Sequence, residues 1–109
     1  MKKTKCKPIT FGEGHRDPNS PYNKFKSAIK DEFSGSKTYD GKIEVLFIIF
    51  ITKLRSGRSD LDNYTKPIID ALHEVRVFKS ESQIYKICME KVDVENEGDE
   101  GIIIKLNPL

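Results

Sequence analysis

Apolar residues recur at helical spacing shortly after the N-terminal region of the chain. Ser20 and Pro21 predict a helix start, because a serine side chain can accept hydrogen bonds from unpaired amides. Proline at the first helical position loses nothing by lacking an N–H group. Gly35 suits the end of this helix. The apolar positions that predict its buried face are Tyr22, Phe25, Ile29 and Phe33.

A continuous apolar stretch follows the Asp40-Gly41 turn signal and predicts a strand over Lys42 to Lys53. Its residues from Ile43 to Ile51 are mostly β-branched or aromatic, which favours strand over helix. The stretch does not alternate between apolar and polar residues, so we expect burial on both faces of the sheet. A domain of this size has few helices to cover two faces. We therefore expect a second subunit to cover one of them.

A second helix is predicted over Leu61 to Val75 from apolar residues at helical spacing. Pro67 complicates its start, because the proline ring disfavours helical geometry for the residue before it. We expect regular helix from about Pro67 onward, with Leu61 to Lys66 as a looser lead-in turn.

The pattern of residues in the rest of the chain predicts three further strands. Lys7 to Phe11 is a short first strand followed by a loop over Gly12 to Asn19, and Gln83 to Val92 is a later strand. The acidic segment Asp93 to Gly101 is a solvated turn, with Ile102 to Leu106 as the hairpin partner. The order β-α-β-α-β-β indicates an α+β fold with a mixed sheet and two helices, in a single domain over residues 1–109.

Length and composition narrow the class of protein. The chain has 109 residues, of which 33% are charged and 37% hydrophobic, so its core is thin and an oligomer would help it. Cys6 and Cys88 form neither a disulfide framework nor a zinc-ligand spacing. The start of the chain lacks the apolar region of a signal peptide, and the run from Val45 to Ile51 is too short to span a bilayer. We expect a cytoplasmic protein with reduced thiols and no membrane partner.

The net charge of +2 hides an uneven distribution. Five acids lie between Asp93 and Glu100, and outside that segment 12 acids stand against 19 bases. This surplus suits a polyanionic partner such as nucleic acid, although exposed lysines often do no more than keep a domain soluble.

One passage combines acids and a lysine at regular spacing. Asp60 and Asp62 are two residues apart, and Asp62, Lys66 and Asp70 are each four apart. Converging carboxylates are the hard oxygen ligands that Mg²⁺ accepts, and a lysine between them can meet a phosphate. The same spacing also fits a helix cap followed by ordinary surface ion pairs, so spacing alone leaves both interpretations open.

The passage resembles the RusA-type Holliday junction resolvases. The resemblance rests on Asp60-Leu61-Asp62-Asn63, then Lys66, then Asp70-Ala71-Leu72, and after a short connection Ser80-Glu81-Ser82-Gln83-Ile84. It implies a homodimeric, Mg²⁺-dependent endonuclease, with Mn²⁺ as a substitute, that nicks four-way DNA junctions symmetrically in recombination and repair. Such enzymes are often encoded by phages or prophages.

The resemblance also implies roles for individual residues. Asp60 and Asp62 match two essential metal-binding acids, Lys66 matches the essential lysine, and Asp70 matches a supporting acid. Glu81 stands where the family usually has the third metal-linked acid, an aspartate, and it is one methylene longer. Ser80 replaces the acid that usually precedes it. The segment from Gly12 to Pro21 also departs from the family, because it contains His15 and Arg16 where many members carry a loop rich in proline and arginine.

Contacts with DNA are expected from basic residues of the first helix and of the segment before the acids, and such contacts should weaken with salt. These residues are Lys24, Lys26, Lys30, Lys53, Arg55 and Arg58. Three alternatives remain: a catalytically impaired module that binds DNA junctions, a structural protein whose acids cap a helix, and a nuclease that prefers flaps or other branched DNA.

Overall fold

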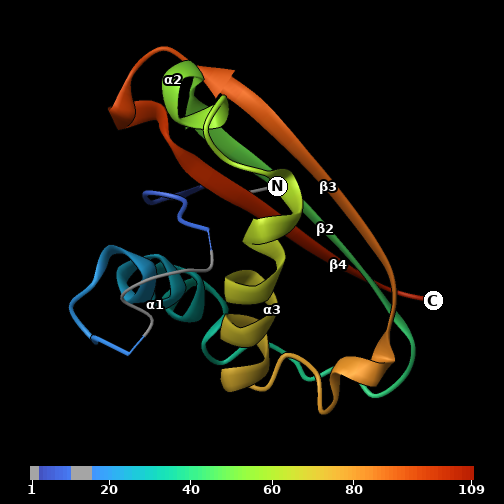
Figure 1. The fold of residues 1–109 in the computed structure, drawn as a ribbon. Helices are drawn as coiled ribbons and strands as arrows, with labels where there is room; N and C mark the ends of the chain where they lie inside the picture. The colour runs from blue at the N-terminus through green and yellow to red at the C-terminus, as the bar shows by residue number, and fades with distance from the viewer. Residues whose placement is uncertain (1–2, 11–15) are drawn as a thin grey trace.

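The computed structural model describes residues 3–10 and 16–109. Within them the chain forms one mixed sheet of four strands in the order β1-β4-β2-β3, with helices on one face (Figure 1). The α+β architecture expected from the sequence is therefore confirmed. The strands are β1 (Thr4–Lys5), β2 (Ile43–Thr52), β3 (Ile84–Val94) and β4 (Gly101–Pro108).

The pairing of the last two strands differs from the predicted hairpin. β3 pairs with β2 in parallel, whereas β4 pairs with β2 in antiparallel fashion on its other side. The hairpin prediction is therefore wrong. The physical reason lies in β2, whose apolar side chains gain most burial when a strand flanks it on each edge.

The first strand also lies elsewhere than predicted. β1 is Thr4–Lys5, and the described residues 7–10 form no strand, while Phe11 lies outside the described residues. The predicted loop over Gly12 to Asn19 is confirmed for residues 16–19, and residues 12–15 lie outside the described part of the chain. β1 pairs with the start of β4, where a side chain at Gly101 would come within 2.5 Å of the Thr4 carbonyl oxygen. This close approach requires glycine.

Helix α1 (Pro21–Phe33) follows the sequence prediction. The Ser20 Oγ accepts a hydrogen bond from the Asn23 amide at 3.2 Å, and Pro21 occupies the first turn. The chain leaves the helix through Gly35, whose φ of +80° is a conformation that glycine adopts without strain.

Helix α3 (Thr65–Glu74) begins two residues before Pro67, because the first amides of a helix have no partner within it. The predicted lead-in turn is confirmed as the 3-10 helix η1 (Leu61–Tyr64). Three other short segments are helical: α2 (Lys53–Ser56), η2 (Glu81–Gln83) and η3 (Glu97–Asp99). No helix in the described part of the chain is long and apolar enough to cross a membrane.

α1 and α3 cover the same face of the sheet, and the core lies between them and β2 (Figure 1). Burial along β2 alternates strictly, so burial on both faces is not achieved by this chain alone. The buried side chains include Phe47 and Ile49, whereas Ile48 and Phe50 between them are half-buried. The strand register places further half-buried apolar residues beside them on the face away from the helices. We call this the outer sheet face; its apolar residues are Leu46, Ile48, Phe50, Cys88, Val92, Val94 and Ile103.

Candidate active site

The acid-bearing segment runs from the end of β2 through α2 and η1 into α3. Asp60 is the N-cap of η1 in extended geometry, and its carbonyl accepts the Asn63 amide at 3.1 Å. Tyr64, which is 1% exposed, is the last residue of η1, and its hydroxyl donates a hydrogen bond to the Ser59 Oγ at 2.8 Å. The segment is therefore anchored on both sides of Asp60 and Asp62.

Glu81 is positioned by a capping arrangement at the start of η2. The Ser80 Oγ accepts a hydrogen bond from the Ser82 amide at 3.2 Å, and the Gln83 Oε1 accepts one from the Ser80 amide at 3.0 Å. The Gln83 Nε2 in turn donates to the Tyr39 and Gly41 carbonyls, each at 2.9 Å. Ser80, which departs from the family pattern, thus acts as a cap. The sequence prediction assigned no role to Gln83, although the spacing of a serine and a glutamine three residues later is a recognisable capping signal.

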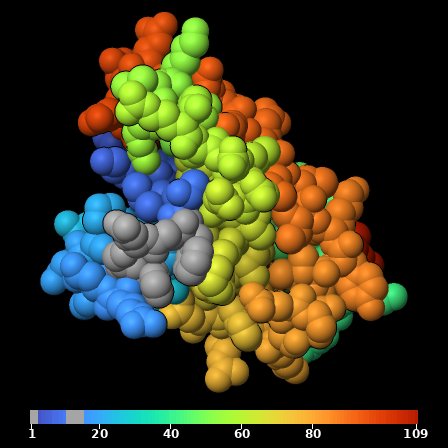
Figure 2. All heavy atoms as spheres, in the orientation of Figure 1, coloured from blue at the N-terminus to red at the C-terminus, as the bar shows by residue number. Residues whose placement is uncertain are grey.

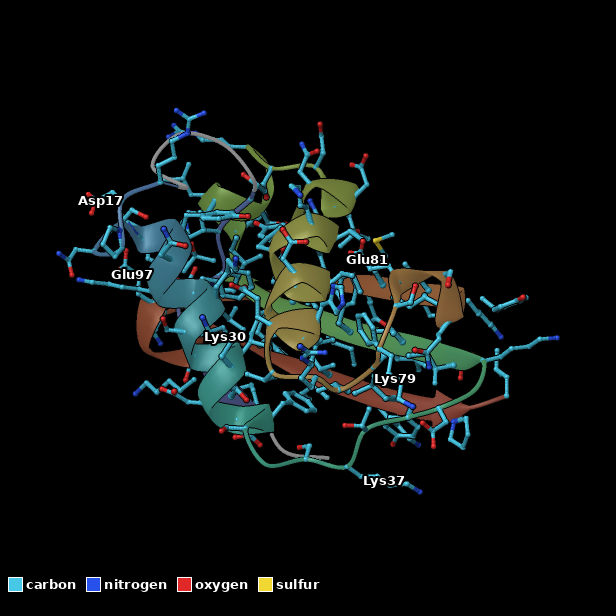
Figure 3. All side chains as sticks on the ribbon, turned by 90° about the horizontal axis from the view of Figure 1, so that it is seen from below. Asp17, Lys30, Lys37, Lys79, Glu81 and Glu97 are labelled. Carbon is cyan, nitrogen blue, oxygen red and sulfur yellow. The ribbon has the colours of Figure 1, made fainter. Side chains whose placement is uncertain are left out.

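An open cavity of about 430 Å³ brings four of the predicted site residues together. It lies between α3 and the β3 side of the sheet, whose segments meet on one face of the molecule (Figure 2). Figure 3 shows the Glu81 side chain on the side of its segment that faces α3. Asp60 does not line this cavity. Its lining residues are Asp62, Thr65, Lys66, Ile69, Asp70, Glu81, Ile84 and Ile87.

Lys66 and Asp70 form an ion pair inside this cavity, with 3.2 Å between Nζ and Oδ2. The two side chains are 56% and 31% exposed, and exposed pairs contribute at most about 1 kcal/mol of stability. The surface-pair interpretation of the spacing is therefore confirmed for Lys66 and Asp70. Because the pair is weak, Lys66 can exchange Asp70 for a phosphate at little energetic cost.

The acids present fit a magnesium site of few protein ligands. Across residues 3–10 and 16–109, no three Asp, Glu, His or Cys side chains are grouped closely enough to hold a metal ion. The expected set of Asp60, Asp62 and Glu81 is therefore not gathered into such a group. Asp62 and Glu81 nevertheless line one cavity. Magnesium usually takes one or two protein carboxylates and completes its shell with water and phosphate oxygens, so this donor set suits it.

The structure gives Arg55 partners within the chain. Its guanidinium pairs with Glu100, with 2.6 Å between Nη1 and Oε1, and also donates to the Pro8 carbonyl. Glu100 is 2% exposed and its other oxygen accepts the Thr52 amide at 2.9 Å. The prediction of a fully solvated acidic turn is thus wrong at Glu100, because this carboxylate ties the end of β2 to the start of β4.

The other predicted DNA-binding residues fall into two groups. Lys26 and Lys30 of α1 approach Glu74 of α3 at 2.8 and 3.9 Å. The remaining bases are exposed to solvent: Lys24, Lys53 and Arg58.

Comparison with known proteins supports the resemblance seen in the motif. A search of curated proteins finds no match. A family model described as endodeoxyribonuclease RusA matches residues 13–107, which include every acid of the cavity as well as Lys66. The chain therefore belongs to the RusA family of endodeoxyribonucleases.

Proposed function

We propose that this protein is a Mg²⁺-dependent endonuclease that resolves four-way DNA junctions by paired, symmetric nicks during recombination and repair. Membership of the RusA family implies Holliday junction resolvase activity. The observation that carries the rest is the single cavity lined by Asp62, Lys66, Asp70 and Glu81. Hydrolysis of a phosphodiester needs carboxylates to hold a cation and a positively charged side chain to bind the phosphate, and this cavity offers both.

Asp62 and Glu81 are the residues that would hold the ion, and Asp60, two residues before Asp62 and outside the cavity lining, is proposed as a further ligand. When bound, a divalent cation lowers the pKa of a coordinated water and neutralises charge on the phosphate. Mn²⁺ prefers similar oxygen ligands and is expected to substitute.

Lys66 supplies positive charge where the scissile phosphate would enter the cavity. Its ammonium group is a compact charge on a flexible stem, which suits it to follow a phosphate whose charge increases during cleavage. Asp70 pairs with this ammonium at 3.2 Å. We therefore propose Lys66 as a catalytic residue and Asp70 as a supporting acid.

Binding to the junction is proposed to rest on phosphate contacts from basic residues of α1 and of the segment that leads to Asp60. Lys53 is the first residue of α2 and Arg58 follows the end of that helix, in the segment that leads to Asp60, and Lys24 is exposed on α1. Lys26 and Lys30 share one carboxylate, so they retain positive charge for DNA. Arg55 is the weakest of the predicted contacts, since buried Glu100 and the Pro8 carbonyl occupy its guanidinium. Such contacts should weaken steeply as salt increases.

Cutting of an end-labelled synthetic four-way junction tests this proposal. The parental protein should produce nicks at symmetric positions with Mg²⁺ or Mn²⁺, and none with EDTA. Lys66→Ala should slow cutting by about 100-fold or more, by analogy with the loss of one electrostatic donor at a transition state. Lys37→Ala, an exposed lysine near Tyr39 and outside the cavity lining, is the matched control and should cut at the parental rate.

Two results would contradict the proposal. A parental protein that binds junctions tightly but cuts none of them in Mg²⁺ would favour the impaired junction-binding module. Preferential cutting of flaps or linear duplexes over four-way junctions would contradict the proposed substrate.

A further inference from the structure

Lys91 lies in a row of β3 side chains that faces the helices. In the parallel register it pairs with Ile49, which is fully buried, and its neighbours in the same row are Met89 and Ile87. A lysine on the core side of a sheet requires hydrogen-bond partners for its ammonium group, because burying an unpaired charge is costly. The half-buried Lys91 therefore needs a structural explanation.

The partners of Lys91 are two backbone carbonyls just before the catalytic acids. Its Nζ donates to the Ser56 oxygen at 2.9 Å and to the Ser59 oxygen at 2.8 Å. Ser56 is the last residue of α2, and Ser59 is bonded directly to Asp60. Lys91 thus links the edge strand β3 to the backbone from which Asp60 and Asp62 project.

The other bonds of this turn are local. The Ser59 amide reaches the Ser56 carbonyl at 3.4 Å, and the Ser59 Oγ donates to the Arg55 carbonyl at 3.2 Å. Both join residues within five positions of each other, in a turn that also contains Gly57, the residue type with the widest conformational freedom. The Lys91 bonds span more than thirty positions, so they fix the turn relative to the sheet.

We propose that Lys91 is a positioning residue for the metal-binding acids of this chain. By holding the Ser59 carbonyl, it sets the direction in which the chain enters η1 and hence the placement of Asp60 and Asp62 relative to Glu81. The inference rests on the proposed function. Lys91 differs from Lys66, because its ammonium is directed to backbone carbonyls and it does not line the cavity.

The test compares Lys91→Met, which keeps an unbranched stem without donors, with Lys91→Arg, which keeps donors. Binding of Mn²⁺ to the DNA-free protein, followed by electron paramagnetic resonance, should weaken about tenfold in Lys91→Met. Lys91→Arg should restore it to within about threefold. The Mg²⁺ concentration for half-maximal cutting should shift in parallel, and amide exchange should accelerate at residues 57–61 but not in α1.

Ile29→Val, a core substitution in α1, controls for a general loss of stability. Ile29→Val should lower the melting temperature about as much as Lys91→Met does, but it should leave Mn²⁺ binding unchanged. If Lys91→Met does not fold, Lys91→Gln replaces it, with a weaker shift in the same direction.

Two results would overturn the inference while leaving the proposed function intact. In the first, the parental protein cuts junctions and Lys91→Met binds Mn²⁺ as tightly as the parental protein. In the second, Ile29→Val loses as much Mn²⁺ affinity as Lys91→Met. A parental protein that neither binds Mn²⁺ nor cuts junctions would instead overturn the proposed function, and the positioning role with it.

Discussion

At the scale of single residues, the proposed chemistry depends most on the Asp62 carboxylate. Asp62→Asn preserves the shape of the side chain but removes the charge that a cation requires. We expect junction cutting to fall by about 100-fold or more, while binding in EDTA stays equal or becomes tighter, because less negative charge faces the DNA. Cleavage and gel-shift assays on the same junction measure both, with Asp99→Asn on the remote turn as a control. Cutting at the parental rate would show that Asp62 has no catalytic part.

Cys6 gives a prediction about pH. Burial, together with the negative charge of Glu100, raises the pKa of the Cys6 thiol to about 12. An unfolded cysteine has a pKa near 9.0, so between these values the unfolded chain releases a proton that the folded chain retains. The contribution of the Cys6 thiol to the free energy of unfolding is therefore complete below pH 9 and declines as pH rises toward 12.

The corresponding measurement is alkylation by iodoacetamide at pH 8.5, read by peptide mass spectrometry. Cys6 should react more slowly in the folded protein than in urea by about 100-fold or more, because the thiolate is the reactive form. Equal rates in the two states would show that the folded environment does not suppress ionisation of this thiol.

The site residues differ in how far the sequence could place them. Asp62, Lys66 and Asp70 were predictable as a group, because helical spacing puts them on one face and the structure confirms that they share a cavity. The approach of Glu81 followed from family resemblance, since nothing in its local sequence relates it to α3. Lys91 was not predictable, because its partners are backbone carbonyls more than thirty residues away.

At the scale of elements, the end of α3 contains a residue in an unfavourable conformation. Arg76 has a φ of +62°, in the left-handed region that glycine adopts most easily, and its amide donates to the His73 carbonyl at 3.0 Å. Arg76→Gly should raise the free energy of unfolding by about 1 kcal/mol, because it removes the steric cost of this conformation. Urea denaturation measures the change, and Arg76→Ala should give little or none. A destabilised glycine variant would mean that the arginine side chain contributes more than its backbone strain costs.

The elements themselves were predictable where their signals are local. Ser20, Pro21 and Gly35 mark the ends of α1 because capping depends on neighbouring residues. The pairing of β4 with β2 was not predictable, because hydrogen bonding between strands depends on partners distant in sequence. The buried Glu100 illustrates the same limit: within an acidic run it resembles a surface residue, and its burial depends on pairing with Arg55, which is 45 positions away in the chain.

At the scale of the whole molecule, the outer sheet face is the feature that a single chain leaves incomplete. In the described part of the chain both long helices cover the opposite face. The apolar centre of the outer face is flanked by charged residues, including the pair Lys86–Glu44 at 3.1 Å. An apolar centre with a polar rim is typical of protein interfaces. The two symmetric nicks of the proposed function would be made most simply by two active sites, which a twofold homodimer provides.

We therefore predict that a second copy of the chain packs on this face, and Ile48→Glu tests it. Ile48 lies at the centre of the face, between Glu90 on β3 and Ile103 on β4. A glutamate at position 48 would therefore place its carboxylate beside that of Glu90 and inside the predicted dimer interface. Burying such charges without partners should weaken dimerisation by at least about 100-fold. Sedimentation at micromolar concentration should show a parental dimer and a monomeric variant, whereas Leu54→Glu, at a side chain 67% exposed on α2, should remain dimeric. The monomer should also lose the coordination of the two nicks on one junction. A parental protein that sediments as a monomer would require each nick to be made by an independent binding event, and the outer face would then have another partner.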